Sequence, residues 1–328
     1  MIIGAPLDSE SLGPAASHLD AELLLDERAC CAMDARLQYS ERSAGASVLP
    51  IVTVRSIAAL SASYQRMLGL EGLSGRIDMI GGGVSHLSSL ACTAEGADRE
   101  GSLSPMIQSA VEDAVARDGH ALAISVNETD LPMFSQIDGF RALVGAGPSH
   151  FVLDPHGVAS IDEFVQSQAR DVRKVWRRDL RDSIRLALTF EVEPLRPAGC
   201  ARAASAVADT LALNGGDGSR ELAELRLSSY LRRPGTQLLG VVSGAGESSF
   251  LGMTVLGGVL DVHTFGMLSH ARARREHYQF MFRACLQFAL DHDIVEVRFG
   301  LEHRWPKIAR GCTEMRRWRV LYSEGRET

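Results

Sequence analysis

Two basic residues near the C-terminus have the types and the spacing of an anion-binding pair. Lys307 and Arg310 lie three positions apart, so in a helix they share a face. The chain contains 34 basic residues, of which only Lys174 and Lys307 are lysines, so a retained lysine is more informative than another arginine. Such a pair can bind a phosphate or stabilise a developing oxyanion. The alternative interpretation is a solvated surface turn.

Glu302 and His303, just before this pair, are candidates for proton transfer. Glu302 follows an expected strand, at the point where a site would open, so its carboxylate could accept a proton from an attacking amine. Pairing of Glu302 with Arg298 or Arg304 explains it equally well. His263, in another expected strand, is a weaker candidate, and because it alternates with apolar residues, packing is the alternative interpretation.

A basic segment in the middle of the chain is the one local positive patch of the sequence. The pattern S-I-D-E at 160–163 predicts a capping box, and a helix is expected to follow it. Contact with phosphate groups or with tRNA is one interpretation. Because Asp171, Asp179 and Asp182 interleave with the basic residues, a charged surface helix is the other. The residues proposed to contact the donor are Arg170, Arg173, Lys174 and Arg177.

The elements that position these residues are clearest in the second half. Apolar strands separated by short glycine turns over 236–267 predict an antiparallel meander. Helical spacing follows over 274–292, then an alternating strand at 294–299 and a final short strand at 318–322. Helices are also expected at 201–213 and 220–231.

The same order of elements occurs in the first half. A strand, turn and strand are expected over 37–54, a helix over 105–117 and a strand over 120–126. The segment 107–126 and the segment 282–299 each read as a helix, a short turn and a strand. This repetition predicts a degenerate duplication, with one domain at 1–154 and a second, carrying the active site, at 155–328.

The C-terminal stretch F-G-L-E-H-R-W-P-K-I-A-R-G-C resembles a motif of the GNAT-fold proteins of peptidoglycan biosynthesis, the relatives of the Fem-type aminoacyltransferases. The segment S-I-D-E-F-V-Q-S-Q-A-R-D-V-R-K-V-W-R-R is similar to that family's entry to its second domain. The residues that match the C-terminal motif are Gly300, Glu302, His303, Lys307, Ala309, Arg310 and Gly311.

The resemblance implies an α/β (α+β) fold of two tandem GNAT-like domains and a reaction that forms an amide bond. In that fold the strands expected at 259–267 and 294–300 hold the acyl group. The backbone N–H groups of Phe265, Gly266 and Met267 are then the candidates for stabilising the oxyanion. Arg310 and Gly311 are expected on the side of the acyl donor.

The segment before the main helix bears on the identity of the donor. GNAT enzymes that use acetyl-CoA usually have a glycine-containing loop there, which wraps the pyrophosphate. Here the segment reads L-S-H-A-R-A-R-R-E-H-Y, without glycine. Arg272, Arg274 and Arg275 could bind phosphate through their side chains instead. This shifts the expectation from acetyl-CoA toward aminoacyl-tRNA or another carrier.

Composition narrows the remaining possibilities. A net charge of −7 over 328 residues gives no global electrostatic argument for nucleic-acid binding. The six cysteines form neither a zinc pattern nor a disulfide framework, and no signal peptide or membrane-spanning run is recognisable, so a cytoplasmic protein is expected. No phosphate-binding loop, nucleophile elbow or metal-ligand spacing occurs, and no metal is predicted.

The sequence therefore predicts an N-acyl or N-aminoacyl transferase, with no permanently bound cofactor and with the acyl donor as co-substrate. The donor is an aminoacyl-tRNA, a CoA thioester or an acyl carrier protein. The acceptor is the amine of a small metabolite or of a cell-wall precursor. Two alternatives stay open, an acyl-CoA-dependent N-acetyltransferase and a catalytically silent tandem-GNAT binding protein.

Overall fold

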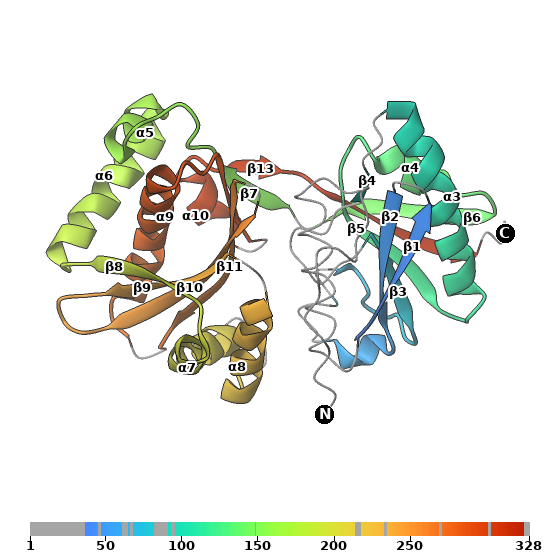
Figure 1. Ribbon diagram of the computed structural model, residues 1–328, viewed down its shortest axis with the longest axis horizontal. Coiled ribbons are helices and arrows are strands. Elements are labelled where there is room, and N and C mark those ends of the chain that lie inside the picture. Colours follow the sequence, from blue (N-terminus) through green and yellow to red (C-terminus); the bar gives the residue numbers. More distant parts are fainter. Residues whose placement is uncertain are drawn as a thin grey trace. The chain divides into compact units, whose positions relative to one another are not determined.

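The computed structural model describes residues 37–44, 47–60, 65, 68–81, 91–92, 96–147, 149–213, 218–232, 235–256, 258–268, 271–300 and 303–324. The chain divides into two compact units, which are shown in Figure 1. The first unit consists of residues 1–148 together with 316–328, and the second of residues 149–315. The C-terminal residues, which the sequence analysis places in the second domain, are therefore part of the first unit.

The first unit is built on one mixed sheet with the strand order β1-β2-β3-β5-β14-β6, and with β4 paired to β2. Its strands are β1 (Leu37–Ala44), β2 (Ser47–Val54), β3 (Ile77–Ile80), β4 (Ala91–Cys92), β5 (His120–Val126), β6 (Phe140–Ala146) and β14 (Trp318–Glu324). Its helices are η2 (Ile57–Ala59), α3 (Gly96–Val115) and α4 (Leu131–Ser135). The expected strand pair at 37–54 and the strand at 120–126 are confirmed, and α3 begins earlier than the expected helix.

The second unit has a sheet with the strand order β13-β7-β12-β11-β10-β9-β8. Its strands are β7 (His150–Leu153), β8 (Thr189–Pro194), β9 (Thr236–Val242), β10 (Ser248–Leu256), β11 (Val259–Met267), β12 (Glu296–Phe299) and β13 (Thr313–Met315). Its helices are α5 (Ile161–Ser167), α6 (Arg170–Arg185), α7 (Pro197–Leu213), α8 (Arg220–Ser229), η3 (Tyr230–Arg232), α9 (Arg274–Asp291) and α10 (Arg304–Ile308).

The repeat expected from sequence is confirmed. In the first unit α3 connects β3 to β5, and these two strands are parallel neighbours. In the second unit α9 connects β11 to β12, which are again parallel neighbours. In each sheet an antiparallel meander precedes this crossover, β1-β2-β3 in one and β9-β10-β11 in the other.

The strand beside each crossover comes from an unexpected part of the chain. In the first sheet, β14 lies between β5 and β6 and is antiparallel to both. In the second sheet, β7 occupies the equivalent place between β12 and β13. Thus β7, which follows β6 in the chain, pairs in the second sheet, while β14, which follows β13, pairs in the first.

Helices cover both faces of the second sheet, and Figure 1 shows α7 and α8 on the opposite face from α6 and α9. The alternation of side chains along β9 explains this arrangement, since Leu239 packs in the core beneath α9 and Leu238 in the core beneath α7. No helix within the described ranges is long and apolar enough to cross a membrane.

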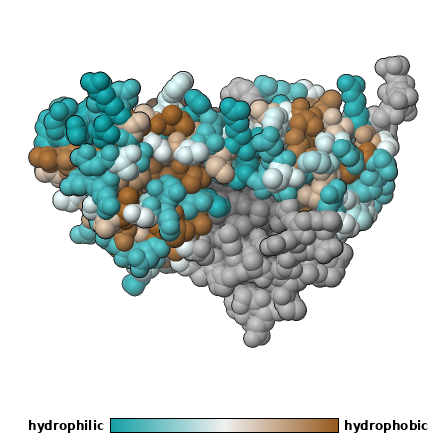
Figure 2. Space-filling view, turned by 90° about the horizontal axis from the view of Figure 1, so that it is seen from above, coloured by the Kyte–Doolittle hydropathy of each residue, from teal (hydrophilic) through white to brown (hydrophobic). Residues whose placement is uncertain are grey.

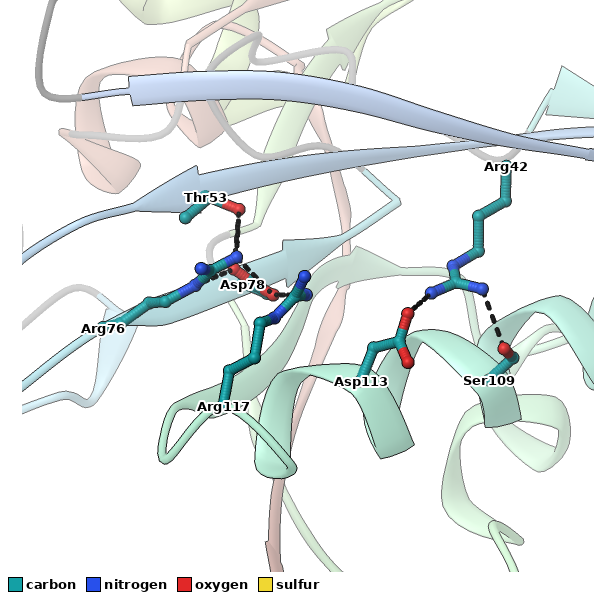
Figure 3. A network of polar contacts seen from close by, with 7 residues as sticks. All are labelled: Arg42, Thr53, Arg76, Asp78, Ser109, Asp113 and Arg117. Carbon is teal, nitrogen blue, oxygen red and sulfur yellow. Dashed lines mark hydrogen bonds and ion pairs between the residues drawn. The ribbon is translucent and has the colours of Figure 1, made fainter.

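A buried carboxylate fixes the meander of the first unit to the end of its main helix (Figure 3). Asp78 on β3 is 1% exposed and accepts hydrogen bonds from Thr53 at 2.6 Å and from Arg76 at 3.0 Å. Arg117, just past α3, donates to the same carboxylate at 2.9 Å. Because buried charge is costly unless paired, these contacts indicate a structural network.

Candidate functional site

The candidate site begins where the two parallel strands of the second sheet separate. β11 and β12 are paired from Val259 with Glu296 to Val262 with Phe299. β11 then continues to Met267, whereas β12 ends. Within the part of the chain that the structure describes, no strand pairs with this edge of β11 beyond Val262. The backbone of residues 263–267, which includes the predicted oxyanion donors, therefore borders the point of divergence.

Helix α7 crosses this end of β11 at very close range. A Cβ on Gly266 would lie 2.6 Å from the backbone nitrogen of Val207, so only glycine allows the contact. Met267 donates its N–H to the buried hydroxyl of Thr210 at 3.1 Å. The amide of Met267 is thus engaged in holding α7, and Phe265 and Gly266 are the other two backbone candidates.

Aromatic side chains cluster beside the diverging strands on the face of α9. Tyr278 of α9 lies edge-to-face with Phe265 at a ring-centroid distance of 5.2 Å and with Phe282 at 5.6 Å. The ring centroids of Phe282 and Phe299 are 4.5 Å apart, and those of Tyr278 and His303 are 6.1 Å apart. The cluster joins the end of β11 to the end of β12 through α9.

Lys307 lies inside this unit rather than on a solvated turn. Its side chain is in α10, the residue is only 4% exposed, and its ammonium group donates to the carbonyl of Gly300. The Nζ atom also lies 4.7 Å from the centre of the Phe151 ring, a cation–π contact. Lys307 therefore fixes the residue that directly follows β12, where the strands diverge.

Arg310 is buried as well and pairs with a carboxylate of the basic helix. It is 2% exposed, and its guanidinium lies 2.6 Å from the Asp179 carboxylate of α6. Its carbonyl accepts a hydrogen bond from the indole of Trp176 at 3.1 Å, and its guanidinium stacks over Phe282. Burial lowers the pKa of Arg310, and Asp179 opposes that effect. These contacts hold α6 against α9 and α10.

Gly311 completes the same junction, because a Cβ there would lie 2.5 Å from the Gln168 side chain and its φ is +87°. Of the other residues in the C-terminal motif, His303 is exposed, with a left-handed φ of 58°, and Glu302 lies outside the described residues. The structure thus brings Lys307, Arg310 and Gly311 together at one junction.

The basic helix α6 places its cations on two sides. Arg170, Lys174 and Arg177 are exposed, and Arg181 and Arg185 continue the same row. Arg173 is partly buried and donates to the carbonyl of Gln168. The expected capping box is confirmed, since Glu163 donates its N–H to the Ser160 hydroxyl at 3.1 Å. A helix break at 168–169 divides the expected single helix into α5 and α6.

The three arginines expected to bind phosphate lie at the start of α9 and differ in environment. Arg272 and Arg275 are exposed. Arg274 is partly buried and donates to the carbonyl of Met267 and, at 2.8 Å, to Thr210. Burial lowers the pKa of Arg274. Arg274 therefore ties α9 to α7 and to the end of β11.

Sequence reasoning missed one residue at this place, Glu247. Its carboxylate accepts the backbone N–H groups of Arg272 at 2.9 Å and of Ala273 at 3.2 Å. These hydrogen bonds lower the pKa of Glu247. The only available signal was an acidic residue in a hairpin turn, 27 positions before the helix that it caps.

His263 agrees with its packing interpretation. The residue is 7% exposed, and its ring stacks on Tyr230 at 3.8 Å. Its Nε2 atom lies 3.1 Å from the hydroxyl of Thr254. Gly252 leaves room for the imidazole, because a Cβ there would lie 2.8 Å from its Cε1 atom.

Comparison with solved structures identifies the fold. FemX matches with a TM-score of 0.59 and 12% identity over 96% of each chain. L-PGS from Bacillus licheniformis matches with a TM-score of 0.59 and 12% identity, covering 100% of this chain and 95% of that one. A tandem GNAT protein from the clavulanic acid biosynthesis pathway matches with a TM-score of 0.51 and 14% identity over 99% and 98%. No family model matches the sequence. No curated protein matches it either.

These structures confirm that the chain has a tandem GNAT fold of the kind found in Fem-type proteins, as its C-terminal motif indicates. At identities of 12–14% the likeness concerns the fold, and the reaction has to be argued from the chain's own residues.

Proposed function

We propose that this protein transfers an aminoacyl group from an aminoacyl-tRNA to the amine of a small metabolite or a cell-wall precursor, forming an amide. One observation carries the proposal: a row of five exposed cations on α6 that ends beside the start of α9. The fold shared with FemX and L-PGS supports the same reaction class.

The cation row consists of Arg170, Lys174, Arg177, Arg181 and Arg185, all of which are exposed. Their intervals of three or four residues place them on one face of the helix. At 1.5 Å per residue the row extends for about 22 Å, a length suited to several phosphates of a nucleic-acid backbone. Hydrophilic residues dominate the left end of the surface in Figure 2, the end at which Figure 1 shows α6.

Most of this charge is available to a ligand. Lys174 pairs with Asp171 at 3.1 Å, and Arg185 lies 3.4 Å from Asp182 and 3.8 Å from Glu276 in the first turn of α9. Among the residues that the structure describes, Arg170, Arg177 and Arg181 form no ion pair. The contact of Arg185 with Glu276 connects the row to the helix that adjoins the diverging strands.

The reaction needs a donor to the oxyanion, an acceptor for the proton of the amine and a fixed position for the two diverging strands. The neutral amine attacks the ester carbonyl, the amide bond forms, and the 3′-oxygen of the tRNA leaves with a proton. One N–H group of β11, that of Phe265 or of Gly266, is the proposed donor to the oxyanion. Glu302, or a water that it orients, is the proposed acceptor of the amine proton. Lys307 holds the Gly300 carbonyl and so fixes the opposite side of the divergence.

Charge reversal of the row tests this proposal. The double variant Arg170→Glu, Arg177→Glu should bind aminoacyl-tRNA at least about tenfold more weakly at low salt, because phosphate contacts are lost. The difference should shrink as salt is added. The matched control is Arg141→Glu, Arg316→Glu, which makes the same change in net charge at exposed positions of the first unit.

Filter binding at several salt concentrations measures the affinities, and mass spectrometry of mixtures of charged tRNA with candidate amines detects the amide product. Equal affinity of the row variant, the control variant and the unmodified protein at low salt would refute the role of α6. Amide formation from acyl-CoA but from no charged tRNA would refute the donor.

A further inference from the structure

The amino end of α9 has the features of a phosphate-binding site. Helix α9 connects two parallel strands, and in such units anions bind where the helix starts, because its first N–H groups point outward and the helix dipole is positive there. The cap residue, Ala273, offers no side-chain hydrogen bond to these groups. Acceptors from elsewhere are therefore needed at this end of the helix, and an anion suits the positive end of the dipole.

Glu247 supplies an acceptor from within the chain for the two amides that lead into α9, those of Arg272 and of the cap residue Ala273. Its two carboxylate oxygens accept the N–H groups of Arg272 at 2.9 Å and of Ala273 at 3.2 Å, one oxygen to each amide. The same hydrogen bonds keep the pKa of Glu247 below its ordinary value, so the side chain is ionised at neutral pH. A negative charge from the chain itself thus lies at the two amides that lead into α9.

The turn that carries Glu247 is closed by two hydrogen bonds of its own and is joined to the end of α6 by a third. Ser243 donates its N–H to the Glu247 carbonyl at 2.9 Å, and its hydroxyl accepts the Glu247 N–H at 3.2 Å. Gly244 donates to the carbonyl of Leu186, just past α6, at 2.9 Å. These contacts fix the backbone of Glu247 in the turn from which its carboxylate reaches the start of α9.

Charges of both signs surround this end of α9, where Arg272 and Arg275 are exposed. Glu276, in the first turn of α9, adds a second carboxylate beside the same helix end. Arg274 directs its guanidinium to Met267 and Thr210 instead of toward a ligand at the helix start. Of these groups only the Glu247 carboxylate contacts the two amides, and its charge disfavours a doubly charged group in the same place.

We propose that Glu247 is a specificity-determining residue, which excludes acyl donors that present a diphosphate to the start of α9, as CoA thioesters do. The inference rests on the proposed function in one respect only, the identity of the donor that is not excluded. That donor is an ester whose polyanionic carrier contacts α6. The exclusion itself concerns binding and requires no turnover.

Isothermal titration calorimetry with CoA and with inorganic diphosphate tests the exclusion on the full chain. Glu247→Ala vacates the two amides and should bind both probes about tenfold more tightly than the unmodified protein. The control is Glu276→Ala, which removes a carboxylate from the same helix turn without freeing the amides of Arg272 and Ala273. This control should gain clearly less affinity than Glu247→Ala.

Hydrogen exchange of residues 271–276 locates the binding, and protection of these amides by CoA only in Glu247→Ala is the expected result. Tight CoA binding by the unmodified protein with protection of the same amides would overturn the proposal. A folded Glu247→Ala protein without any gain in affinity would overturn it too. Loss of amide formation from charged tRNA in all forms of the protein would instead refute the proposed function and leave the binding result standing.

Discussion

At the scale of single residues, the burial of Lys307 changes the role that we assign to its side chain. As one of two lysines in an arginine-rich chain, it stands out in the sequence as a candidate for holding an anion. Its ammonium instead donates to the carbonyl of Gly300 and lies over the ring of Phe151. A buried ammonium that donates to a backbone carbonyl holds the backbone of the site in position and is not available to bind a substrate directly.

Two variants separate the contribution of the packed stem of Lys307 from that of its ammonium group. Lys307→Ala should lower the free energy of unfolding by about 1–3 kcal/mol, since it leaves the Gly300 carbonyl without its donor and removes the packed stem. Lys307→Met retains the stem and removes only the ammonium, so it should recover part of that stability. Both should lower turnover by about 100-fold, because Gly300 is no longer held in place beside the diverging strands.

Urea denaturation and transfer assays on the same preparations measure the two effects. Wild-type turnover in a folded Lys307→Met protein would show that the ammonium is dispensable for the reaction.

His277 gives the second unit a dependence on pH. It is fully buried on α9, with its Nδ1 atom 2.9 Å from the hydroxyl of Ser249, and burial lowers its pKa. A histidine whose pKa is lower in the folded state binds fewer protons there than in the unfolded state. The stability it supports is therefore complete above the unfolded pKa of about 6.5 and declines as the pH falls below it.

His277→Asn keeps a polar group near Ser249 but cannot be protonated. The difference in unfolding free energy between the variant and the unmodified protein should therefore shift in favour of the variant from pH 7 to pH 5. Parallel pH profiles of the two proteins would contradict a buried neutral histidine.

Some of the site could be predicted from residue types alone. The C-terminal motif indicates Lys307, Arg310 and Gly311, which the structure places together. The ion pair between Arg310 and Asp179 could not be predicted. The two residues are 131 positions apart and meet only when α6 packs against α9. Glu247 was missed for the same reason, since a cap from a distant turn leaves no local pattern.

At the scale of elements, the start of α9 depends on Glu247. Replacing Glu247 by Gln should lower stability at pH 7 by about 1 kcal/mol, the usual worth of a helix cap with a favourable charge. Because the folded-state pKa of Glu247 is lowered, its contribution is present above the ordinary pKa and is lost as the pH falls through the folded value. The stability difference between the two proteins should therefore disappear in strong acid, and urea titrations from pH 7 to pH 3 measure it.

The accuracy of the predicted elements followed the strength of their local patterns. Strands β9, β10 and β11 agree with the expected meander because glycine turns separate clear apolar runs. β8 was missed although T-F-E-V-E-P alternates, since it is a short edge strand between two helices. β3 has only four residues, all of them buried, so its run I-D-M-I has no alternation to recognise.

At the scale of the whole molecule, the internal repeat could be predicted from the order of elements in the sequence. The pairing of β7 in the second sheet and of β14 in the first could not be predicted. β7 has four residues and β14 has seven, and neither sequence pattern selects one sheet over the other. Strand partners depend on non-local pairing, which neither periodicity nor turn chemistry specifies. The sequence-based boundary at 154 therefore fell close to β7, while the return of the chain to the first sheet was missed.

This pairing of β14 predicts an unusual effect of shortening the chain. β14 lies between β5 and β6, and Val320 and Tyr322 are at most 1% exposed in the core beneath α3. Removal of residues 316–328 should therefore expose both neighbouring strands and unfold the first unit, although the deletion is far away in the sequence. The second sheet keeps all its strands, so α9 and β11 should retain their protection in hydrogen exchange, while α3 and β5 lose it. Removal of residues 325–328 alone is the control, because it leaves β14 complete. Equal protection of α3 in both shortened proteins would mean that the first sheet is stable without its central C-terminal strand.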